Sequence, residues 1–352
     1  MAPCKSSRRN IILAGVSAVG ALAATLAHRT TRVRPTPTQF ATAPSQTTHP
    51  PLSEPTNARE QTTPDTLARG TMPQRTLGRT GLSLPVLGLG GSASPLSRPG
   101  AEAEAIAIIE RSLALGVQYF DTAANYGPSE ERLGQVLPGY RDQVVIGSKT
   151  SRRDRDGAWA QLETNLKRLN TDYLDIWQFH ALTHGWDIDT ILDRQSGAIL
   201  AAEEAREQGV IGAIGITGHH NPDIITQALQ RYPFDTALIP INAADIHTPT
   251  PFITHILPMA QSQNVGIIAM KVPAYGRLFK PGVLSGMAEA MGYVLSQSGV
   301  HCCIIAAETI AQLEENVQVA QGFQPMPTDN LADIEQRTTS VWRENSFFRS
   351  WG

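Results

Sequence analysis

Four side chains that can move protons stand at or just after the ends of three consecutive apolar stretches. Asp121 ends the first stretch, and Tyr126 follows it five residues later. Lys149 closes the second stretch and His180 closes the third. A free tyrosine has a pKa of about 10, so it is a poor acid at neutral pH unless its phenolate is stabilised. Each residue alone would be ordinary, but the four together predict acid–base chemistry.

A lysine near the tyrosine would supply that stabilisation. An ammonium group about 4 Å from a phenolate interacts with it by about 4 kcal/mol at an effective dielectric constant of about 20. Since about 1.36 kcal/mol corresponds to one pKa unit, we expect Lys149 to lower the pKa of Tyr126 by up to about 3 units. Asp121 is the expected counter-charge of Lys149. The alternative is a buried tyrosine, a core ion pair and a histidine satisfied by its neighbours.

The rest of the chain alternates short apolar stretches with amphipathic ones. The stretches are continuous apolar runs, which is typical of parallel strands buried on both faces. Eight strand–helix alternations predict an α/β protein of the (β/α)8 TIM-barrel class, preceded by a hairpin within 72–91. The expected strands are 86–89, 119–121, 144–147, 173–179, 213–216, 236–240, 265–270 and 301–305. The expected helices are 102–115, 129–136, 158–169, 191–208, 222–230, 254–263, 284–297 and 310–320.

An open doubly wound sheet is the competing fold. Such a sheet places a glycine fingerprint after its first strand, where the phosphates of a nucleotide meet a helix. The sequence LGLGG at 87–91 has the glycines but neither that spacing nor a following helix. A barrel is therefore favoured, and its strands bring their carboxyl ends to one face, where catalytic groups gather.

The residues resemble the aldo-keto reductases. Asp121, Tyr126, Lys149 and His180 are similar to the catalytic tetrad of that family, and RTLGRTG at 75–81, YGPSEERLG at 126–134 and QLEEN at 312–316 resemble its other motifs. The resemblance runs from about residue 75 to about residue 323. It implies a barrel that reduces an aldehyde or ketone to an alcohol with NAD(P)H. Tyr126 would be the general acid, and His180 would orient the carbonyl.

The resemblance also implies where NAD(P)H binds, and there the sequence departs from the family. Thr217 and Gly218 stand where many members hold the nicotinamide amide with a Ser-Asn pair. Met270 stands where an aromatic ring often stacks on the nicotinamide, and Leu238 where a glutamine is common. The other positions implied to contact the cofactor are Lys271, Glu308, Gln312, Glu315 and Asn316.

The positions near the adenosine ribose carry no cation. Family members that prefer NADP(H) usually place a lysine or arginine there, and arginine suits a phosphate especially well. This chain has Ala306, Glu308 and Gln312 instead. Glu308 would repel a 2′-phosphate but could accept a hydrogen bond from a free ribose hydroxyl. We expect NAD(H) to bind at least comparably to NADP(H), unless Lys271 or Arg277 holds the phosphate.

The amino-terminal segment is expected to be a targeting signal. Arg8 and Arg9 precede an uncharged run, 11–27, that is rich in Ala and Gly and shorter than the roughly 20 residues that span a bilayer. Residues 1–27 resemble a twin-arginine export signal, so export machinery is an expected partner. The location would be periplasmic or otherwise extracytoplasmic, with a membrane tether if the signal is not cleaved. The alternatives are an ordinary secretory signal and a membrane anchor.

Composition predicts a boundary between a linker and the barrel, and it argues against nucleic-acid binding and metal sites. Residues 28–70 are dense in Thr, Pro, Ser and Gln, which predicts a disordered linker before the barrel at 71–323. A net charge of −3 without a dense basic cluster gives no reason to expect nucleic acid. Cys4, Cys302 and Cys303 are too few for an iron–sulfur cluster or a zinc site, and no metal is expected.

Two questions stay open from the sequence. The tail, 324–352, contains a possible helix at 329–342 and an aromatic end, and it could pack on the outside of the barrel or lie near the mouth of the active site. The function has an alternative as well. The same barrel could be a non-catalytic nucleotide-binding sensor or scaffold, because fold alone does not decide function.

Overall fold

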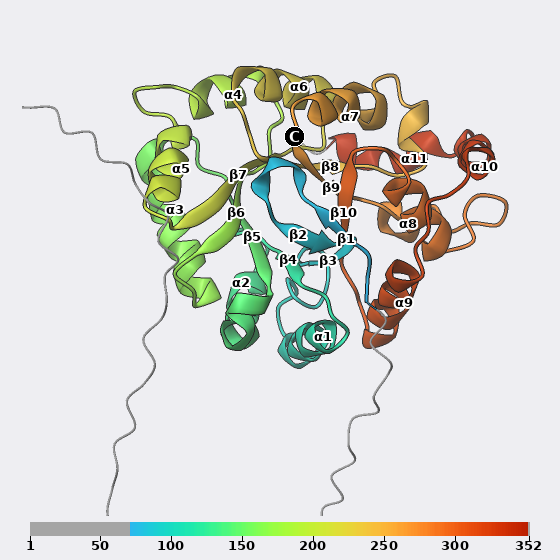
Figure 1. Ribbon diagram of the computed structural model, residues 1–352, viewed down its shortest axis with the longest axis horizontal. Coiled ribbons are helices and arrows are strands. Elements are labelled where there is room, and N and C mark those ends of the chain that lie inside the picture. The colour runs from blue at the N-terminus through green and yellow to red at the C-terminus, as the bar shows by residue number, and fades with distance from the viewer. Residues whose placement is uncertain (1–70, 351–352) are drawn as a thin grey trace, which may run out of the picture. The chain divides into compact units, whose positions relative to one another are not determined.

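Eight parallel strands close into a barrel in the computed structural model, which describes residues 71–350 (Figure 1). The first and last barrel strands pair with each other, so the predicted (β/α)8 class is confirmed. The segments predicted as export signal and linker, 1–27 and 28–70, lie outside the described residues. The barrel strands are β3 (Leu87–Gly90), β4 (Tyr119–Asp121), β5 (Val145–Thr150), β6 (Leu174–Phe179), β7 (Ile211–Thr217), β8 (Thr236–Pro240), β9 (Gly266–Met270) and β10 (Val300–Ile305).

An antiparallel hairpin covers the amino-terminal end of the barrel. It consists of β1 (Gln74–Thr76) and β2 (Ser83–Pro85), and Figure 1 shows it across the end of the barrel that faces the viewer. Leu77 and Leu84 of this hairpin are fully buried and belong to one apolar cluster with Ile176, Ile268 and Cys302 of the barrel strands. The hairpin thus closes the barrel floor, and the opposite end is left for a site.

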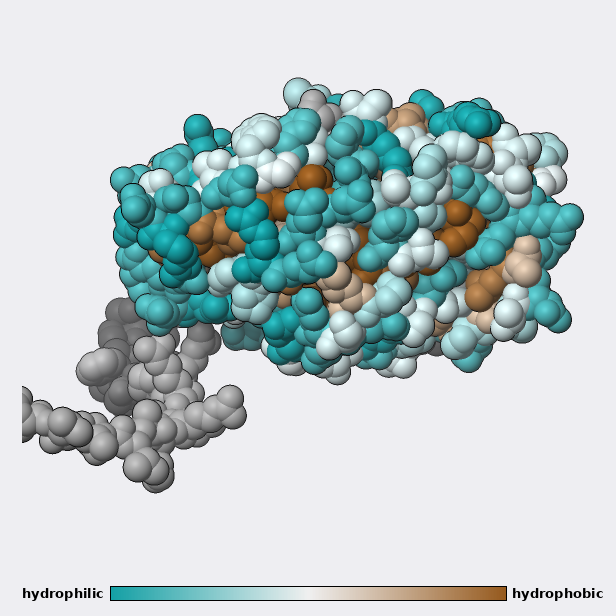
Figure 2. Space-filling view, turned by 90° about the horizontal axis from the view of Figure 1, so that it is seen from above, coloured by the Kyte–Doolittle hydropathy of each residue, from teal (hydrophilic) through white to brown (hydrophobic). Residues whose placement is uncertain are grey.

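The helices cover the outside of the barrel, as parallel strands require. Their apolar faces form a second, larger cluster with the outward-facing strand residues. The helices that follow strands are α1 (Glu102–Ala114), α2 (Ser129–Val136), α3 (Arg155–Leu169), α4 (Gly185–Ile191), α5 (Ala198–Glu207), α6 (Pro222–Arg231), α7 (Phe252–Ser262), α8 (Met287–Leu295) and α9 (Ile310–Gln321). Figure 2 views the side near α4, α6 and α7, where hydrophilic residues dominate and hydrophobic ones show in separate spots.

The helix predicted at 191–208 was wrong in its first part. The chain instead forms α4, turns through 192–197 and then begins α5. Asp193 stabilises the turn, because its Oδ1 accepts hydrogen bonds from the backbone N–H groups of Gln195 and Ser196 at 2.9 and 2.7 Å. Such local side-chain bonds compete with the helix for the backbone donors.

The tail occupies both of the places that the sequence left open, the outside of the barrel and the end where the active site was expected. Its helix α10 (Thr328–Thr338) contacts α8 on the outside of the barrel, where the Tyr293 hydroxyl donates to Glu335 Oε1 at 2.8 Å. After α11 (Trp342–Asn345), the short 3-10 helix at Phe347–Ser350 contacts the loops after β7 and β8. There Arg349 pairs with Asp245 at 2.6 Å. The last described residues of the tail are therefore at the carboxyl-terminal face of the barrel. No helix within residues 71–350 is long and apolar enough to cross a membrane.

Candidate active site

The structure brings Asp121, Lys149 and Tyr126 together at the carboxyl-terminal end of the barrel. Asp121 and Lys149 face the interior from adjacent strands, β4 and β5, and each side chain is only 1% exposed. Lys149 Nζ donates hydrogen bonds to Asp121 Oδ1 and to the carbonyl oxygen of Thr122, the latter at 2.7 Å. The same nitrogen lies 4.8 Å from the centre of the Tyr126 ring. The predicted counter-charge is thus present, and one donor of the ammonium group is left for the phenol.

A tight turn positions Tyr126. The backbone N–H of Tyr126 donates to the carbonyl oxygen of Ala123 at 3.0 Å, and Gly127 adopts a φ of 53°. A Cβ atom at Gly127 would lie 2.5 Å from the carbonyl oxygen of Ser97, so a side chain there would be both strained and obstructed. The glycine lets the loop after β3 pack directly against the turn that carries Tyr126.

The polar residues after Gly127 hold the turn in place. Glu130 is fully buried and accepts a hydrogen bond from Ser148 Oγ, on β5, at 2.6 Å. Ser129 Oγ bonds with Thr122 Oγ1 at 2.9 Å. Arg132 is also buried, and its guanidinium donates to backbone carbonyls of the loop after β3, including that of Leu96 at 3.1 Å. The residues of the motif YGPSEERLG, at 126–134, therefore form a scaffold around Tyr126.

The predicted lowering of the Tyr126 pKa was wrong in this state of the protein. Burial of the phenol raises its pKa above the ordinary value, and Lys149 offsets this increase only in part. The expectation counted the attraction of the ammonium group but not the loss of water around the phenolate. Although burial opposes it, Asp121 raises the pKa of Lys149, so the ammonium group stays charged. At neutral pH the phenol is accordingly protonated, which is the form that a proton donor needs.

His180 completes the group of four. Its ring lies 5.7 Å from that of Tyr126, centre to centre, at an angle of 88° between the ring planes. The backbone of His180 is fixed by a hydrogen bond from its N–H to the carbonyl oxygen of Thr150 at 2.8 Å. Burial, together with the charge of Lys149, holds the pKa of His180 well below its usual value. The imidazole is therefore neutral at neutral pH and has one N–H to donate.

Two residues that the sequence reasoning missed hold the other side of Asp121. Gln178 Nε2 donates to Asp121 Oδ2 at 3.0 Å, and the Tyr119 hydroxyl donates to the same oxygen at 3.1 Å. Both side chains are completely buried. Alternate residues of a strand face the same side. Tyr119 precedes Asp121 by two positions on β4, so the sequence could have predicted that the two side chains point to the same side of the strand.

A cavity of about 550 Å³ opens beside the tetrad. Asp121 and Tyr126 line one end of it, and α9 lies at the other end. Of the residues that the resemblance implied for the cofactor, six line this cavity: Met270, Lys271, Glu308, Gln312, Glu315 and Asn316. Leu238 lines it as well. The cavity thus connects the catalytic end with the expected nucleotide end.

Thr217 and Gly218 are not among the residues that line the cavity. Thr217 is 1% exposed, and its carbonyl oxygen accepts a hydrogen bond from the N–H of Leu182 at 2.8 Å. A Cβ atom at Gly218 would lie 2.7 Å from the carbonyl oxygen of Leu182. The loop after β6 contacts both residues, and they lie outside the cavity wall.

The lining fits a nicotinamide dinucleotide. The volume lies within the usual range of small-molecule sites. Gly90 and Gly91 leave one wall without side chains, while Gln312 and Asn316 offer polar groups at the far end. Lys271 adds a cation to the lining, and its Nζ donates to the Tyr275 hydroxyl at 2.8 Å. A cation of this kind suits the phosphates of a dinucleotide.

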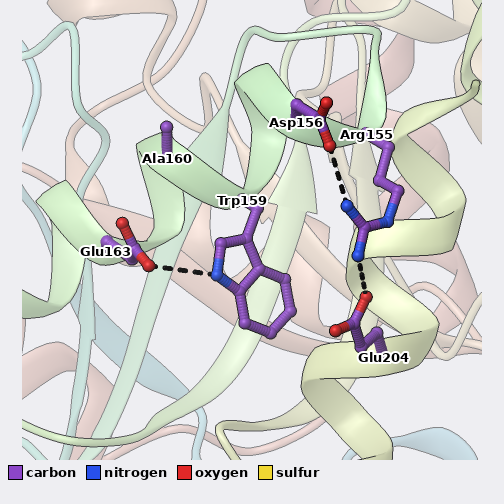
Figure 3. Close-up of a pocket in the computed structure, with 6 residues that line it drawn as sticks. All are labelled: Arg155, Asp156, Trp159, Ala160, Glu163 and Glu204. Carbon is purple, nitrogen blue, oxygen red and sulfur yellow. Dashed lines mark hydrogen bonds and ion pairs between the residues drawn. The ribbon is translucent and has the colours of Figure 1, made fainter.

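A second hollow, of about 340 Å³, lies on the outer surface between α3 and α5 (Figure 3). Arg155 there pairs with Asp156 at 2.7 Å and with Glu204 at 2.5 Å, and Trp159 Nε1 donates to Glu163 Oε1 at 3.1 Å. The polar groups of this hollow thus bond to one another on the outer helices. The barrel end with the tetrad is therefore the candidate active site.

Comparison with known proteins agrees with this geometry. The model of the aldo/keto reductase family matches residues 86–291, so the chain belongs to that family. It is 27% identical to L-galactose dehydrogenase of Arabidopsis thaliana over 302 residues, which cover 74% of this chain and 92% of that protein. It is 24% identical to L-glyceraldehyde 3-phosphate reductase of Escherichia coli (strain K12), over 79% of this chain and 96% of that protein.

Solved structures show the same fold. The holo form of an aldo-keto reductase from Bacillus halodurans superimposes with a TM-score of 0.66 at 24% identity, covering 76% of this chain and 96% of that one. An aldo-keto reductase from Klebsiella pneumoniae in complex with NADPH gives a TM-score of 0.62 at 21% identity, with the same coverage. Membership of the family supports NAD(P)H-dependent carbonyl reduction in general, and the chain is an oxidoreductase of this kind.

Proposed function

We propose that this protein reduces an aldehyde or ketone to an alcohol with Tyr126 as the general acid. The observation that carries the proposal is the position of Lys149. Its ammonium group is held by Asp121 and Thr122 next to the Tyr126 ring, in a barrel end that opens into the cavity. A charged lysine is costly to bury, and this one is oriented toward a group that must carry negative charge during the reaction.

The residues divide the reaction as follows. The neutral imidazole of His180 donates a hydrogen bond to the carbonyl oxygen and fixes its position. When bound, NAD(P)H supplies the hydride that reaches the carbonyl carbon. The Tyr126 phenol gives its proton to the carbonyl oxygen, which becomes the alcohol hydroxyl, and water later returns a proton to Tyr126. Lys149 stabilises the transient phenolate, and Asp121 keeps the ammonium group charged and in place.

The substrate class is a small carbonyl compound. L-glyceraldehyde 3-phosphate reductase and methylglyoxal reductase are among the proteins that the chain resembles, and both names denote reduction of small aldehydes or ketones. L-galactose dehydrogenase is named for the reverse direction. A tyrosine that donates a proton in reduction accepts it in oxidation. We therefore propose that both directions are open and that the supply of oxidised or reduced cofactor decides between them.

The cofactor preference follows from the far end of the cavity. Among the described residues that line the cavity, Lys271 alone is cationic. The family resemblance implies that Glu308 and Gln312 lie near the ribose 2′ position. We propose that NAD(H) binds at least comparably to NADP(H). A preference for NADP(H) above about 100-fold, or about 2.7 kcal/mol, would contradict this.

A sensor or scaffold that binds nucleotide without catalysis is the second candidate. The observation that favours it is the altered nicotinamide end, where Thr217 and Gly218 are covered and Leu238 and Met270 replace polar and aromatic groups. Such a protein would bind the dinucleotide but would not transfer its hydride.

One experiment separates these functions. The purified protein is titrated with NADH and NADPH by calorimetry, and the oxidation of each is then followed with a panel of small aldehydes and ketones. The proposal predicts binding of at least one cofactor and carbonyl-dependent oxidation. Binding without oxidation across the panel would support the sensor, and absence of binding would contradict both candidates.

We also propose that the protein is exported through its first 27 residues. The support is the Arg8-Arg9 pair before a mildly apolar run. Exchange of both arginines for lysine should leave the precursor in the cytoplasm, as fractionation and immunoblotting would show. Unchanged export of the double variant would instead indicate an ordinary secretory signal or a membrane anchor.

A further inference from the structure

An ion pair bridges two loops at the nucleotide end of the cavity. Arg98, in the loop after β3, donates from Nη2 to Glu308 Oε2 at 2.6 Å. Glu308 follows β10 and lines the cavity, and its backbone N–H donates to Gln312 Oε1 at 2.9 Å. Because β3 and β10 are neighbours in the barrel, the two loops lie next to each other. Under the proposed function, a ribose at this end of the cavity would lie beside this pair.

The loop that presents Arg98 is well fixed. The buried guanidinium of Arg132 donates to the carbonyl oxygen of Arg98 at 2.8 Å and to that of Leu96 at 3.1 Å. The same loop touches the catalytic turn, because the Ser97 carbonyl oxygen lies against Gly127. The backbone of Arg98 is thus held by the scaffold around Tyr126. Its side chain is 55% exposed, so the surrounding protein does not enclose it.

Arg98 is the cation in contact with Glu308, while Arg277 lies over the Phe347 ring, 4.0 Å from its centre. Arg111 is engaged with Glu314 at 2.7 Å. Glu315 also lines the cavity and adds negative charge. Lys271 bonds with Tyr275, on the loop after β9, while Arg98 contacts a residue of the far end directly. A 2′-phosphate would meet the carboxylate of Glu308 and, in contact with it, the guanidinium of Arg98.

We propose that Arg98 enables the site to bind a ribose with either a hydroxyl or a phosphate at its 2′ position. With a free 2′-hydroxyl, as in NAD(H), Glu308 accepts the hydroxyl hydrogen bond and stays paired with Arg98. With a 2′-phosphate, as in NADP(H), Arg98 leaves Glu308 and binds the phosphate. The inference rests on the proposed function, because it assumes that the cavity holds a nicotinamide dinucleotide.

The energetics permit this exchange of partners. An ion pair between exposed side chains contributes little, so breaking it costs little. Arginine and phosphate form short, often bidentate, charge-assisted hydrogen bonds. The same exchange explains how a site with a carboxylate at the ribose could still accept NADP(H).

The test compares both cofactors on variants of the pair. Calorimetric titrations at one ionic strength are made with NADH and NADPH on the wild-type protein and on Arg98→Gln and Glu308→Gln. Arg98→Gln should weaken NADPH at least about 10-fold, or about 1.4 kcal/mol, and leave NADH within about 2-fold. Glu308→Gln should strengthen NADPH, because it removes both the repulsion and the competing partner of Arg98. Arg194→Gln breaks an exposed pair with Glu203 on α5 and should change neither cofactor.

A fragment separates this end of the cavity from the rest. Adenosine 2′,5′-bisphosphate and adenosine 5′-phosphate differ only in the 2′-phosphate and do not reach the catalytic end. Arg98→Gln should weaken the bisphosphate at least about 10-fold and leave adenosine 5′-phosphate within about 2-fold. Equal weakening of both cofactors, or an unchanged affinity for NADPH and for the bisphosphate, would overturn the proposed role of Arg98 but not the proposed function. A wild-type protein that binds neither NADH nor NADPH would overturn the proposed function, and this inference with it.

Discussion

The two ends of the cavity are built in opposite ways. At the catalytic end, Lys149 and Asp121 are almost completely buried, and Thr122, Tyr119 and Gln178 bind them from three sides. At the nucleotide end, Arg98 and Glu308 form one ion pair that is about half exposed on both sides. In the proposed reaction, the first arrangement fixes the geometry for proton transfer. In the proposed cofactor recognition, the second changes partners according to the ligand.

The difference has an energetic consequence. Removing one member of a buried ion pair leaves an uncompensated charge and typically costs about 3–5 kcal/mol, whereas exposed pairs contribute about 0–1 kcal/mol. Substitutions at the catalytic end should therefore change both stability and turnover. Substitutions at the nucleotide end should change ligand choice and leave the fold as it is.

The largest effect is expected for Lys149. Lys149→Met leaves the carboxylate of Asp121 buried without its partner, so the free energy of unfolding should fall by about 3–5 kcal/mol. Carbonyl reduction should fall about 10³-fold, since the phenolate of Tyr126 loses its stabilising charge. Denaturant unfolding and steady-state kinetics measure the two quantities.

Lys280 provides the matched control. Lys280→Met breaks a pair with Glu344 whose side chains are 41% and 51% exposed, and it should cost less than about 1 kcal/mol. Equal destabilisation by the two variants would contradict the distinction between buried and exposed ion pairs.

Gln178 should show a smaller effect that acts through Asp121. Gln178→Leu removes the hydrogen bond to Asp121 Oδ2, so the carboxylate and Lys149 lose part of their orientation, and kcat should fall about 10-fold with little change in KM. In an Asp121→Asn background the same substitution should have almost no further effect, because the two side chains form one unit. Additive losses in the double variant would show that Gln178 acts by another route. Gln135→Leu, which removes an exposed bond to Glu102, is the control.

The smallest effect is a pH dependence of cofactor binding. Burial, together with the charge of Lys149, lowers the pKa of Lys271 to about 8. The ammonium form favours phosphates, so affinity for NADH should be full below pH 8 and should weaken a few-fold as pH rises through this value. Lys271→Met should bind more weakly at neutral pH and show no such decrease, as calorimetry between pH 7 and pH 9 would reveal. A wild-type affinity independent of pH over this range would place Lys271 away from the phosphates.

Much of the catalytic end could be predicted from the sequence. The strand ends of a parallel barrel meet at one face. The positions of Asp121, Lys149 and His180 at the ends of apolar stretches were therefore enough to predict that the three lie together. Tyr119 and Gln178 were missed because a polar residue inside an apolar strand reads as an isolated exception until its partner is known. The pKa of Tyr126 was misjudged because burial depends on surroundings that the local sequence does not contain.

The nucleotide end was harder to predict. Arg98 and Glu308 are 210 positions apart, and their contact arises because the barrel closes between β10 and β3. We therefore considered Glu308 from the sequence without Arg98, its ion-pair partner. The place of the tail had the same difficulty, since Arg349 reaches Asp245 across 104 positions. Long-range contacts between loops leave no periodic pattern in the sequence.

The most direct test of the account is the turnover of Tyr126→Phe, measured together with its affinity for the cofactor. The phenol is proposed to give its proton to the carbonyl oxygen, and the hydroxyl is not needed to hold the cofactor. The account predicts that carbonyl reduction falls at least about 10²-fold, while the affinities for NADH and NADPH stay within about 2-fold of the wild-type values. Near-wild-type turnover by Tyr126→Phe would contradict the role of Tyr126 and, with it, the proposed reaction.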